Sequence, residues 1–149
     1  MAEGILNQML SEAGIGNIRV LSAGTMANGD YPVTRLTRQV AGEHGIDLSS
    51  HRSQYLSLQL VEKADLILVM EKIHRKEIRE WFQNSRDKVF LLRSFGGGES
   101  EDIDDPIGGN QEVFELCYQL IESEIKRIFP ILIQRCRVLT GTNESGIEN

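Results

Sequence analysis

Five carboxylates stand close together in the segment GGGESEDIDDPIGG, residues 96–109. They are Glu99, Glu101, Asp102, Asp104 and Asp105. Carboxylates this close oppose one another's ionisation, which favours a protonated form that can act as a general acid near neutral pH. Pro106 biases the residue before it toward an extended backbone, and Gly108 and Gly109 allow the chain to turn close to a ligand. Asp105 is therefore the carboxylate whose position the sequence restricts most.

Two further interpretations of this acidic segment stay open. A run of charges in a glycine-rich loop is usually a solvated surface without further function. The remaining interpretation is a site for a divalent cation. The segment lacks the regular alternation of oxygen ligands, followed by glycine and a later glutamate, that a calcium loop requires. We therefore expect neither a metal nor another cofactor.

Hydrophobic periodicity predicts helices and strands in alternation. Helices are expected over residues 2–13, 33–44, 57–64, 71–82 and from 111 onward, and strands over 18–23, 65–70 and 88–92. The run DLILVM, residues 65–70, is largely apolar, which is typical of a strand covered on both faces in a parallel sheet. The alternation predicts an α/β fold of three layers, with helices on both faces of a small, mainly parallel sheet. Loops 23–32, 71–73 and 93–110 should then share the edge where such sheets bind ligands.

The composition limits the classes of protein that fit. The chain has 149 residues, of which 40% are hydrophobic, so we expect one domain over residues 1–140 and a mobile polar tail over residues 141–149. A net charge of −6 argues against nucleic acid as a partner. No stretch approaches the roughly 20 apolar residues that cross a bilayer, and no secretion signal is recognised. Cys117 and Cys136 form no metal pair or disulfide framework, which favours a cytoplasmic protein.

Six short segments together resemble one known family. They are MAEG, VLSAGT, GIDLSSHRS, ADLILVMEKIH, RDKVFLL and DDPIGG, in this order. The chain up to about Phe129 is similar to the low-molecular-weight protein tyrosine phosphatases, a family that includes arginine phosphatases and related arsenate reductases. The resemblance implies that Asp105 is the general acid that protonates the leaving group. It also implies that Ser22 and His51 support the phosphate-binding loop, although many relatives have arginine where Gln54 stands.

The resemblance also implies a segment that these residues do not contain. Family members have a first strand and a phosphate-binding loop, with a nucleophilic cysteine and an arginine six positions later, before the helix that MAEG matches. Six positions after Cys117 and Cys136 stand Ser123 and Thr142, so neither cysteine has that arginine. Cys117 lies on the apolar face of its helix and is expected to be a core thiol. We therefore expect the chain as written to be inactive alone, and marginally stable because two strands lose a neighbour in a sheet that has four strands in the family.

The expected activity is a phosphoprotein phosphatase that works through a cysteinyl-phosphate intermediate. Its partner would be a phosphorylated protein or a small phosphomonoester. Phosphotyrosine and phosphoarginine both stay open as substrates, with Tyr31 and Ile107 as possible walls around the substrate. The alternatives are a non-catalytic remnant that binds a partner, and an arsenate reductase-like member. His44 and His74 are expected to face solvent, and the oligomeric state is not determined.

Overall fold

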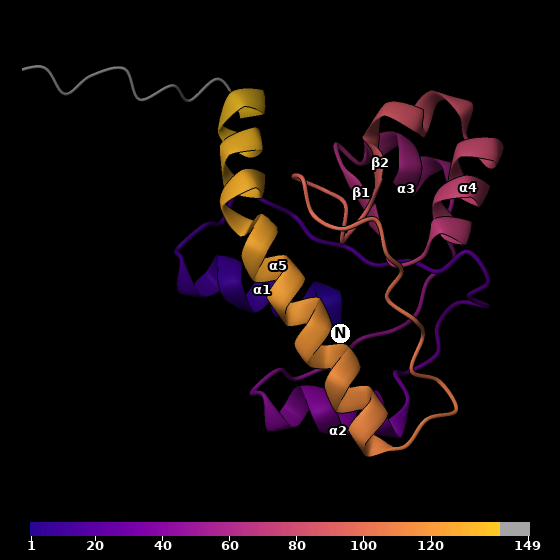
Figure 1. The fold of residues 1–149 in the computed structure, drawn as a ribbon, viewed down its shortest axis with the longest axis vertical. Coiled ribbons are helices and arrows are strands. Elements are labelled where there is room, and N and C mark those ends of the chain that lie inside the picture. Colours follow the sequence, from indigo (N-terminus) through magenta and orange to yellow (C-terminus); the bar gives the residue numbers. More distant parts are fainter. Residues whose placement is uncertain (141–149) are drawn as a thin grey trace, which may run out of the picture.

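The computed structural model of this protein describes residues 1–140. Its elements follow the order α1 (Ala2–Glu12), α2 (Arg35–Glu43), α3 (Leu58–Lys63), β1 (Ile67–Val69), α4 (Lys72–Trp81), the 3-10 helix η1 (Gln83–Lys88), β2 (Val89–Leu91) and α5 (Gln111–Thr140) (Figure 1). All five predicted α-helices are present, with ends within a few residues of the expected ones. The expectation of a mobile tail concerns residues 141–149 and lies outside the described part of the chain.

The sheet consists of two parallel strands. β1 and β2 pair in the register Ile67↔Val89, Leu68↔Phe90 and Val69↔Leu91, and the amide of Leu92 extends the ladder to the carbonyl of Val69 at 2.8 Å. Because parallel strands need a crossover between them, α4 and η1 form that connection. The prediction of a small parallel sheet in an α/β fold is confirmed.

Residues 18–23 form no strand, and this part of the prediction is wrong. A single parallel bridge joins Gly24 to Tyr55, and Leu21 is 50% exposed. The side chains of residues 18–23 have strand-forming types, but a strand exists only where a neighbouring backbone exchanges hydrogen bonds with it. Within residues 1–140, β1 pairs with β2 alone and no ladder reaches residues 18–23.

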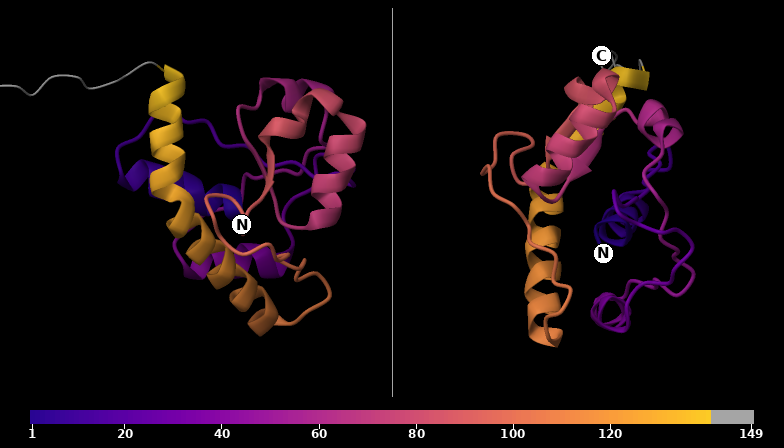
Figure 2. Two further views of the ribbon diagram at one scale, coloured as in Figure 1. Left: turned by 45° about the horizontal axis from the view of Figure 1, so that its top comes forward. Right: turned by 90° about the vertical axis from the view of Figure 1, so that its right-hand side faces the viewer.

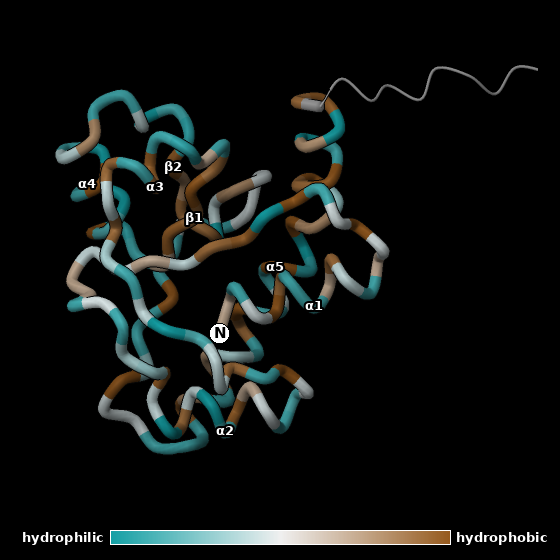
Figure 3. The backbone as a smooth tube through the Cα atoms, turned by 180° about the vertical axis from the view of Figure 1, so that it is seen from behind, coloured by the Kyte–Doolittle hydropathy of each residue, from teal (hydrophilic) through white to brown (hydrophobic). Residues whose placement is uncertain are grey.

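Apolar side chains cover the sheet on both faces. Those of Ile67, Val69, Val89 and Leu91 pack with α3 and α4, around Val61 and Ile78. The alternate residues Leu66, Leu68, Met70 and Phe90 pack against the larger core, which α1, α2 and α5 build. Successive strand residues point to opposite faces, so this division places the sheet between two helical layers. Figure 2 shows the two groups of helices from two sides. In Figure 3, the backbone tube along β1 and β2 is brown, the colour of hydrophobic residues.

Helix α5 passes through Pro130, after which the periodicity predicted no clear structure. Proline in a helix interior removes one backbone hydrogen bond and disfavours the helix by about 3 kcal/mol. Ile125, Ile128 and Leu132 are nevertheless buried in the larger core on both sides of the proline. Burial of this face keeps the helix continuous to Thr140. No helix within residues 1–140 is long and apolar enough to cross a membrane.

Candidate functional site

The acidic loop stands at the carboxyl end of β1. The amide of Ile103 donates to the carbonyl of Met70 at 2.9 Å, directly after β1. Asp102 Oδ1 accepts a hydrogen bond from the amide of Lys72 at 2.8 Å, in the first turn of α4. These two bonds confirm that loops 71–73 and 93–110 share the predicted edge of the sheet.

Three of the five carboxylates of this loop have partners in the structure. Glu99 and Glu101 each pair with one terminal nitrogen of Arg93. Asp102 is occupied by the amide of Lys72. Sequence proximity alone did not show that Arg93, at the start of the same loop, would pair with both glutamates.

Asp105 has a different environment from these three carboxylates. Its side chain is exposed, and Oδ1 accepts a hydrogen bond from the amide of Ile107 at 3.0 Å, which closes a short turn over Pro106. Gly108 follows with a φ of +85°, a conformation that favours glycine. Within residues 1–140, the second oxygen of Asp105 accepts no hydrogen bond. The carboxyl group is thus held in orientation on one side and available on the other.

Ser22 and His51 meet at Glu3, in the first turn of α1. Ser22 Oγ donates to Glu3 Oε2 at 2.5 Å, and His51 Nδ1 lies 3.8 Å from the same oxygen. The side-chain nitrogen Nε2 of Gln54 donates to the backbone carbonyl of Ser22 at 2.8 Å. The structure therefore brings together the two residues that the resemblance singled out, together with Gln54.

Glu3 is the residue of this group that sequence analysis missed. An acidic side chain in the first turn of a helix without a side-chain cap was the available indication, because carboxylates are stabilised there. Since the carboxylate stands between the hydroxyl and the imidazole, this is not the order of a serine hydrolase, in which the histidine contacts the serine. Glu3, His51 and Gln54 line a pocket of about 330 Å³, together with Gly4, Asp47, Leu48, Ser50 and Arg52.

Tyr31 and Ile107, the possible substrate walls, are both exposed, at 61% and 70%. The amide of Tyr31 donates to Ser53 Oγ at 3.2 Å, and its carbonyl accepts from the amide of Ser53 at 2.8 Å. These bonds fix the backbone of loop 23–32 against residues 52–55 and leave the ring of Tyr31 in solvent.

Neither cysteine has the environment of a nucleophile. Burial raises the pKa of the Cys117 thiol, and the neighbouring Asp105 raises it further. Burial also raises the pKa of Cys136, with Asp65 as the second cause. Cys117 packs against the larger core, as expected, and its Sγ lies 3.9 Å from the carbonyl of Asp104. A thiol must ionise to attack phosphorus, and the raised pKa of both groups disfavours the thiolate.

His44 does not simply face solvent, which corrects that expectation. Its ring stacks on Tyr118 at 3.9 Å between centroids, and Nε2 lies 2.9 Å from Glu115 Oε1. His44 follows the last residue of α2, and this position places its ring against α5. Hydrogen bonds from Gln119 and His44 lower the pKa of Glu115. The described residues contain no group of three or more His, Cys, Asp or Glu side chains that could hold a metal ion.

The fold and these sites define an α/β protein with two polar features. They are an acidic loop at the carboxyl end of β1 in a small parallel sheet, and Glu3 in the first turn of α1. The family model described as "Low molecular weight phosphotyrosine protein phosphatase" matches residues 1–137. The chain therefore belongs to the low molecular weight phosphotyrosine protein phosphatase family, as the six segments indicated.

Named relatives include both tyrosine and arginine phosphatases. The chain is 36% identical over 130 residues to the "Probable low molecular weight protein-tyrosine-phosphatase EpsP" of Ralstonia solanacearum, covering 87% of this chain and 84% of the relative. It is 31% identical over 128 residues to the "Protein-arginine-phosphatase" of Bacillus subtilis, covering 86% of this chain and 84% of the relative. A solved structure of a mutant YwlE arginine phosphatase, described as carrying a phosphorylated active-site serine, superposes with a TM-score of 0.84 at 30% identity, covering 88% of this chain and 85% of that one.

Proposed function

We propose that this chain provides the acid-bearing part of a phosphoprotein phosphatase that acts on phosphotyrosine or phosphoarginine. One observation carries the proposal, namely the environment of Asp105. Its carboxyl group is oriented by the amide of Ile107 and exposed on its other side, while Glu99, Glu101 and Asp102 already bind other groups. A general acid must be held in place and still reach its substrate, and Asp105 meets both conditions.

The proposed chemistry has two parts. A cysteine thiolate attacks phosphorus, and the bond to the leaving oxygen or nitrogen breaks as the proton of Asp105 moves to that atom. Water then hydrolyses the cysteinyl phosphate. Support for a covalent intermediate comes from the structural neighbour whose description names a phosphorylated active-site serine. Ser22 and His51, which meet at Glu3, would support the phosphate-binding loop at the start of α1.

The cysteine and the arginine of this scheme have no counterpart among the 149 residues. Cys117 and Cys136 lack an arginine six positions later, and burial holds both thiols in the protonated form. The proposal therefore includes inactivity of the chain as written. A segment with a strand and a Cys-x5-Arg loop in front of Met1 would complete the site, because the N-terminus of α1 offers unpaired backbone amides and a favourable dipole to an anion.

Substrate choice within the proposal depends on Tyr31 and Ile107. Ile107 and the two glycines after it are small or apolar and provide no aromatic ring, so Tyr31 is the candidate to stack on a phosphotyrosine ring. A phosphoarginine substrate needs no such partner. The proposed location is the cytoplasm, which is supported by the cysteine usage of the sequence, because two cysteines among 149 residues form no multi-bridge disulfide framework.

The test compares the 149-residue chain with a form extended at its N-terminus by a strand and a Cys-x5-Arg loop. We expect the extended form to hydrolyse p-nitrophenyl phosphate and either phosphotyrosine or phosphoarginine peptides, and the shorter chain to hydrolyse none of them. A Cys→Ser change within the added loop is the matched control and should abolish turnover. An extended form that folds but hydrolyses no phosphomonoester or phosphoarginine would instead favour a non-catalytic binding module.

A further inference from the structure

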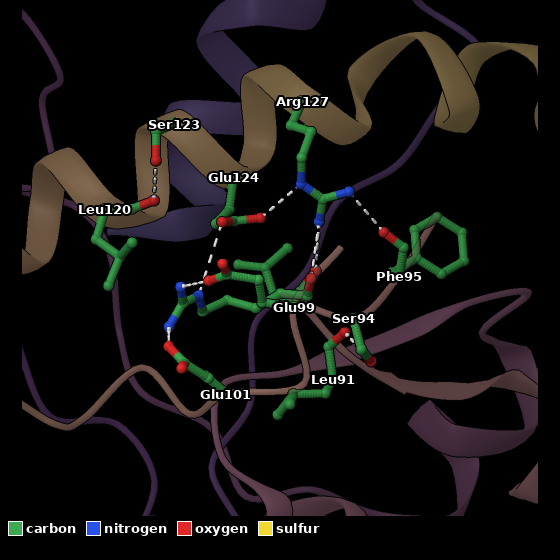
Figure 4. Close-up of polar contacts among 11 residues, drawn as sticks. Leu91, Ser94, Phe95, Glu99, Glu101, Leu120, Ser123, Glu124 and Arg127 are labelled. Atoms are coloured by element: carbon green, nitrogen blue, oxygen red, sulfur yellow. Dashed lines mark hydrogen bonds and ion pairs between the residues drawn. The ribbon is translucent and has the colours of Figure 1, made fainter. Parts of the chain in front are cut away.

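Arg127 of α5 binds the backbone of the segment that leads into the acidic loop. Its Nη1 donates to the carbonyl of Phe95 at 2.9 Å, and its Nη2 donates to the carbonyls of Arg93 and Leu92 at 3.1 and 3.3 Å (Figure 4). Its Nε donates to Glu124 Oε2 at 2.8 Å. One guanidinium group thus joins α5 to three carbonyls that follow β2.

Arg93 binds the other side of the same glutamate. Its Nε, which is buried and donates no hydrogen bond within the described residues, lies 3.7 Å from Glu124 Oε1. Its two terminal nitrogens pair with Glu99 and Glu101 of the acidic loop. The side chains of Arg93 and Glu124 are each 14% exposed, whereas those of Glu99 and Glu101 are 70% and 65% exposed. Glu124 is therefore the least exposed of these carboxylates and is shared by two guanidinium groups.

Three glycines allow this close approach. A Cβ on Gly98 would lie 2.1 Å from the carbonyl oxygen of Arg93 and 2.6 Å from Nη2 of Arg127. A Cβ on Gly96 would lie 2.3 Å from Cδ1 of Ile131 on α5, and Gly96 and Gly97 have φ values of +71° and +88°. The GGG run therefore brings the loop backbone into contact with Arg127 and α5, which side chains would prevent.

We propose that Glu124 is a positioning residue for Asp105, acting through Arg93 and Arg127. The attachments of the loop before Asp105 include this network on α5 and the bonds of Asp102 and Ile103 to the chain after β1. Asp105 follows three residues after Asp102, so its position depends on both attachments. Loss of the Glu124 carboxylate removes the group that both guanidinium groups contact, with the Arg93 side chain 14% exposed and that of Arg127 32% exposed, and this loosens the first attachment. The consequence for catalysis rests on the proposed function of Asp105, whereas the attachment itself does not.

The test measures amide hydrogen exchange by NMR in the 149-residue chain. The variant is Glu124→Gln, and the matched control is Glu122→Gln on the same helix, because Glu122 pairs with exposed Lys126 at 3.0 Å and touches no loop residue of the network. We expect Glu124→Gln to speed exchange at Ile103 and Ile107 roughly tenfold or more, with the amide of Val113 and those within β1 unchanged. Glu122→Gln should leave all of these amides unchanged. Equal acceleration at every amide would show a general loss of stability and would overturn the proposal.

A second variant, Arg127→Lys, tests the network without removing a charge. An ammonium group keeps the charge but cannot donate to Glu124 and three carbonyls in the fixed geometry of a guanidinium. We expect the same selective acceleration at Ile103 and Ile107, and this milder change keeps the test available if Glu124→Gln fails to fold. Wild-type exchange in Arg127→Lys would overturn the proposal. Because exchange is independent of hydrolysis, the result stands apart from whether Asp105 is an acid.

Discussion

The carboxylate of Asp102 accepts a hydrogen bond from the backbone amide of Lys72 at 2.8 Å, across 30 positions of sequence. The amide belongs to the first turn of α4, where no residue of the helix itself can accept its hydrogen bond. Asp102 therefore has a structural task, although it stands three positions from Asp105 in the same acidic run. This division of roles between neighbouring carboxylates leads to the first two predictions.

The first prediction concerns catalysis in the N-terminally extended form. Asp105→Asn should lower kcat by roughly 10²–10⁴-fold, because a general acid contributes about that much. The loss should be larger for phenyl phosphate than for p-nitrophenyl phosphate, because a poor leaving group needs its proton more. Asp102→Asn keeps an oxygen that can accept from Lys72 and should change kcat little. Equal losses in the two variants would show that Asp105 is not the acid.

The second prediction concerns stability. Asp102→Ala removes the acceptor for the amide of Lys72 and should lower the free energy of unfolding by ~0.5–2 kcal/mol, the usual effect of losing a helix cap. Asp102→Asn serves as the control and should stay close to wild type. Urea unfolding of the 149-residue chain, followed by circular dichroism, measures both. A urea midpoint of Asp102→Ala equal to that of wild type would contradict the prediction. It would mean that water replaces the carboxylate with no loss of free energy of unfolding.

The third prediction concerns pH. Hydrogen bonds from Gln119 and His44 lower the pKa of Glu115 in the folded state, so the ionised form stabilises the fold. This contribution is fully present above the unfolded pKa of about 4.3 and is lost as the pH falls through the lower folded value. The stability difference between wild type and Glu115→Gln should therefore shrink as the pH falls below about 4.

Urea midpoints across this pH range provide the measurement, and Glu112→Gln provides the control. Glu112 is an exposed residue in the first turn of the same helix, three positions from Glu115. A wild-type advantage that grows as the pH falls below about 4 would contradict the assigned direction of the Glu115 pKa.

The fourth prediction concerns the glycine run. Gly98→Ala should destabilise the chain, by about 1–3 kcal/mol, because the new methyl group would overlap the carbonyl of Arg93 and the guanidinium of Arg127. Gly42→Ala is the matched control, since a Cβ at this position within α2 meets nothing within 4 Å. It should be neutral or stabilising by up to about 1 kcal/mol. Thermal unfolding of both variants measures the difference, and comparable melting temperatures would contradict it.

The fifth prediction concerns the two thiols. Alkylation of Cys117 by iodoacetamide should be slower at pH 7 than that of free cysteine, and should rise with pH, because burial raises the pKa of this thiol. Cys117→Ser should also leave the activity of the extended form in place. Rapid modification of Cys117 at neutral pH, accompanied by loss of turnover, would show that this thiol has a catalytic part.

Much of the fold could be predicted because its determinants are local. The apolar runs of β1 and β2, the periodicity of the helices and the caps Thr34 and Ser57 all act within a few residues. Residues 18–23 have the same kind of local pattern but form no strand, because a ladder needs a partner from elsewhere in the chain. The continuation of α5 past Pro130 could not be predicted from neighbouring residues either, because burial of Ile128 and Leu132 in the tertiary structure sustains it.

The sequence by itself determined the fold class, the family and the choice of Asp105, because helix periodicity, six short segments and the residues beside Pro106 can all be seen without coordinates. Tertiary structure alone decided which carboxylates are occupied, since the partners of Asp102 and Glu124 come from other elements. It also decided that Ser22 and His51 meet at Glu3. The physical reason is range: backbone preferences act over neighbouring residues, whereas ion pairs and hydrogen bonds between elements exist only after the chain has brought distant positions within about 3–4 Å.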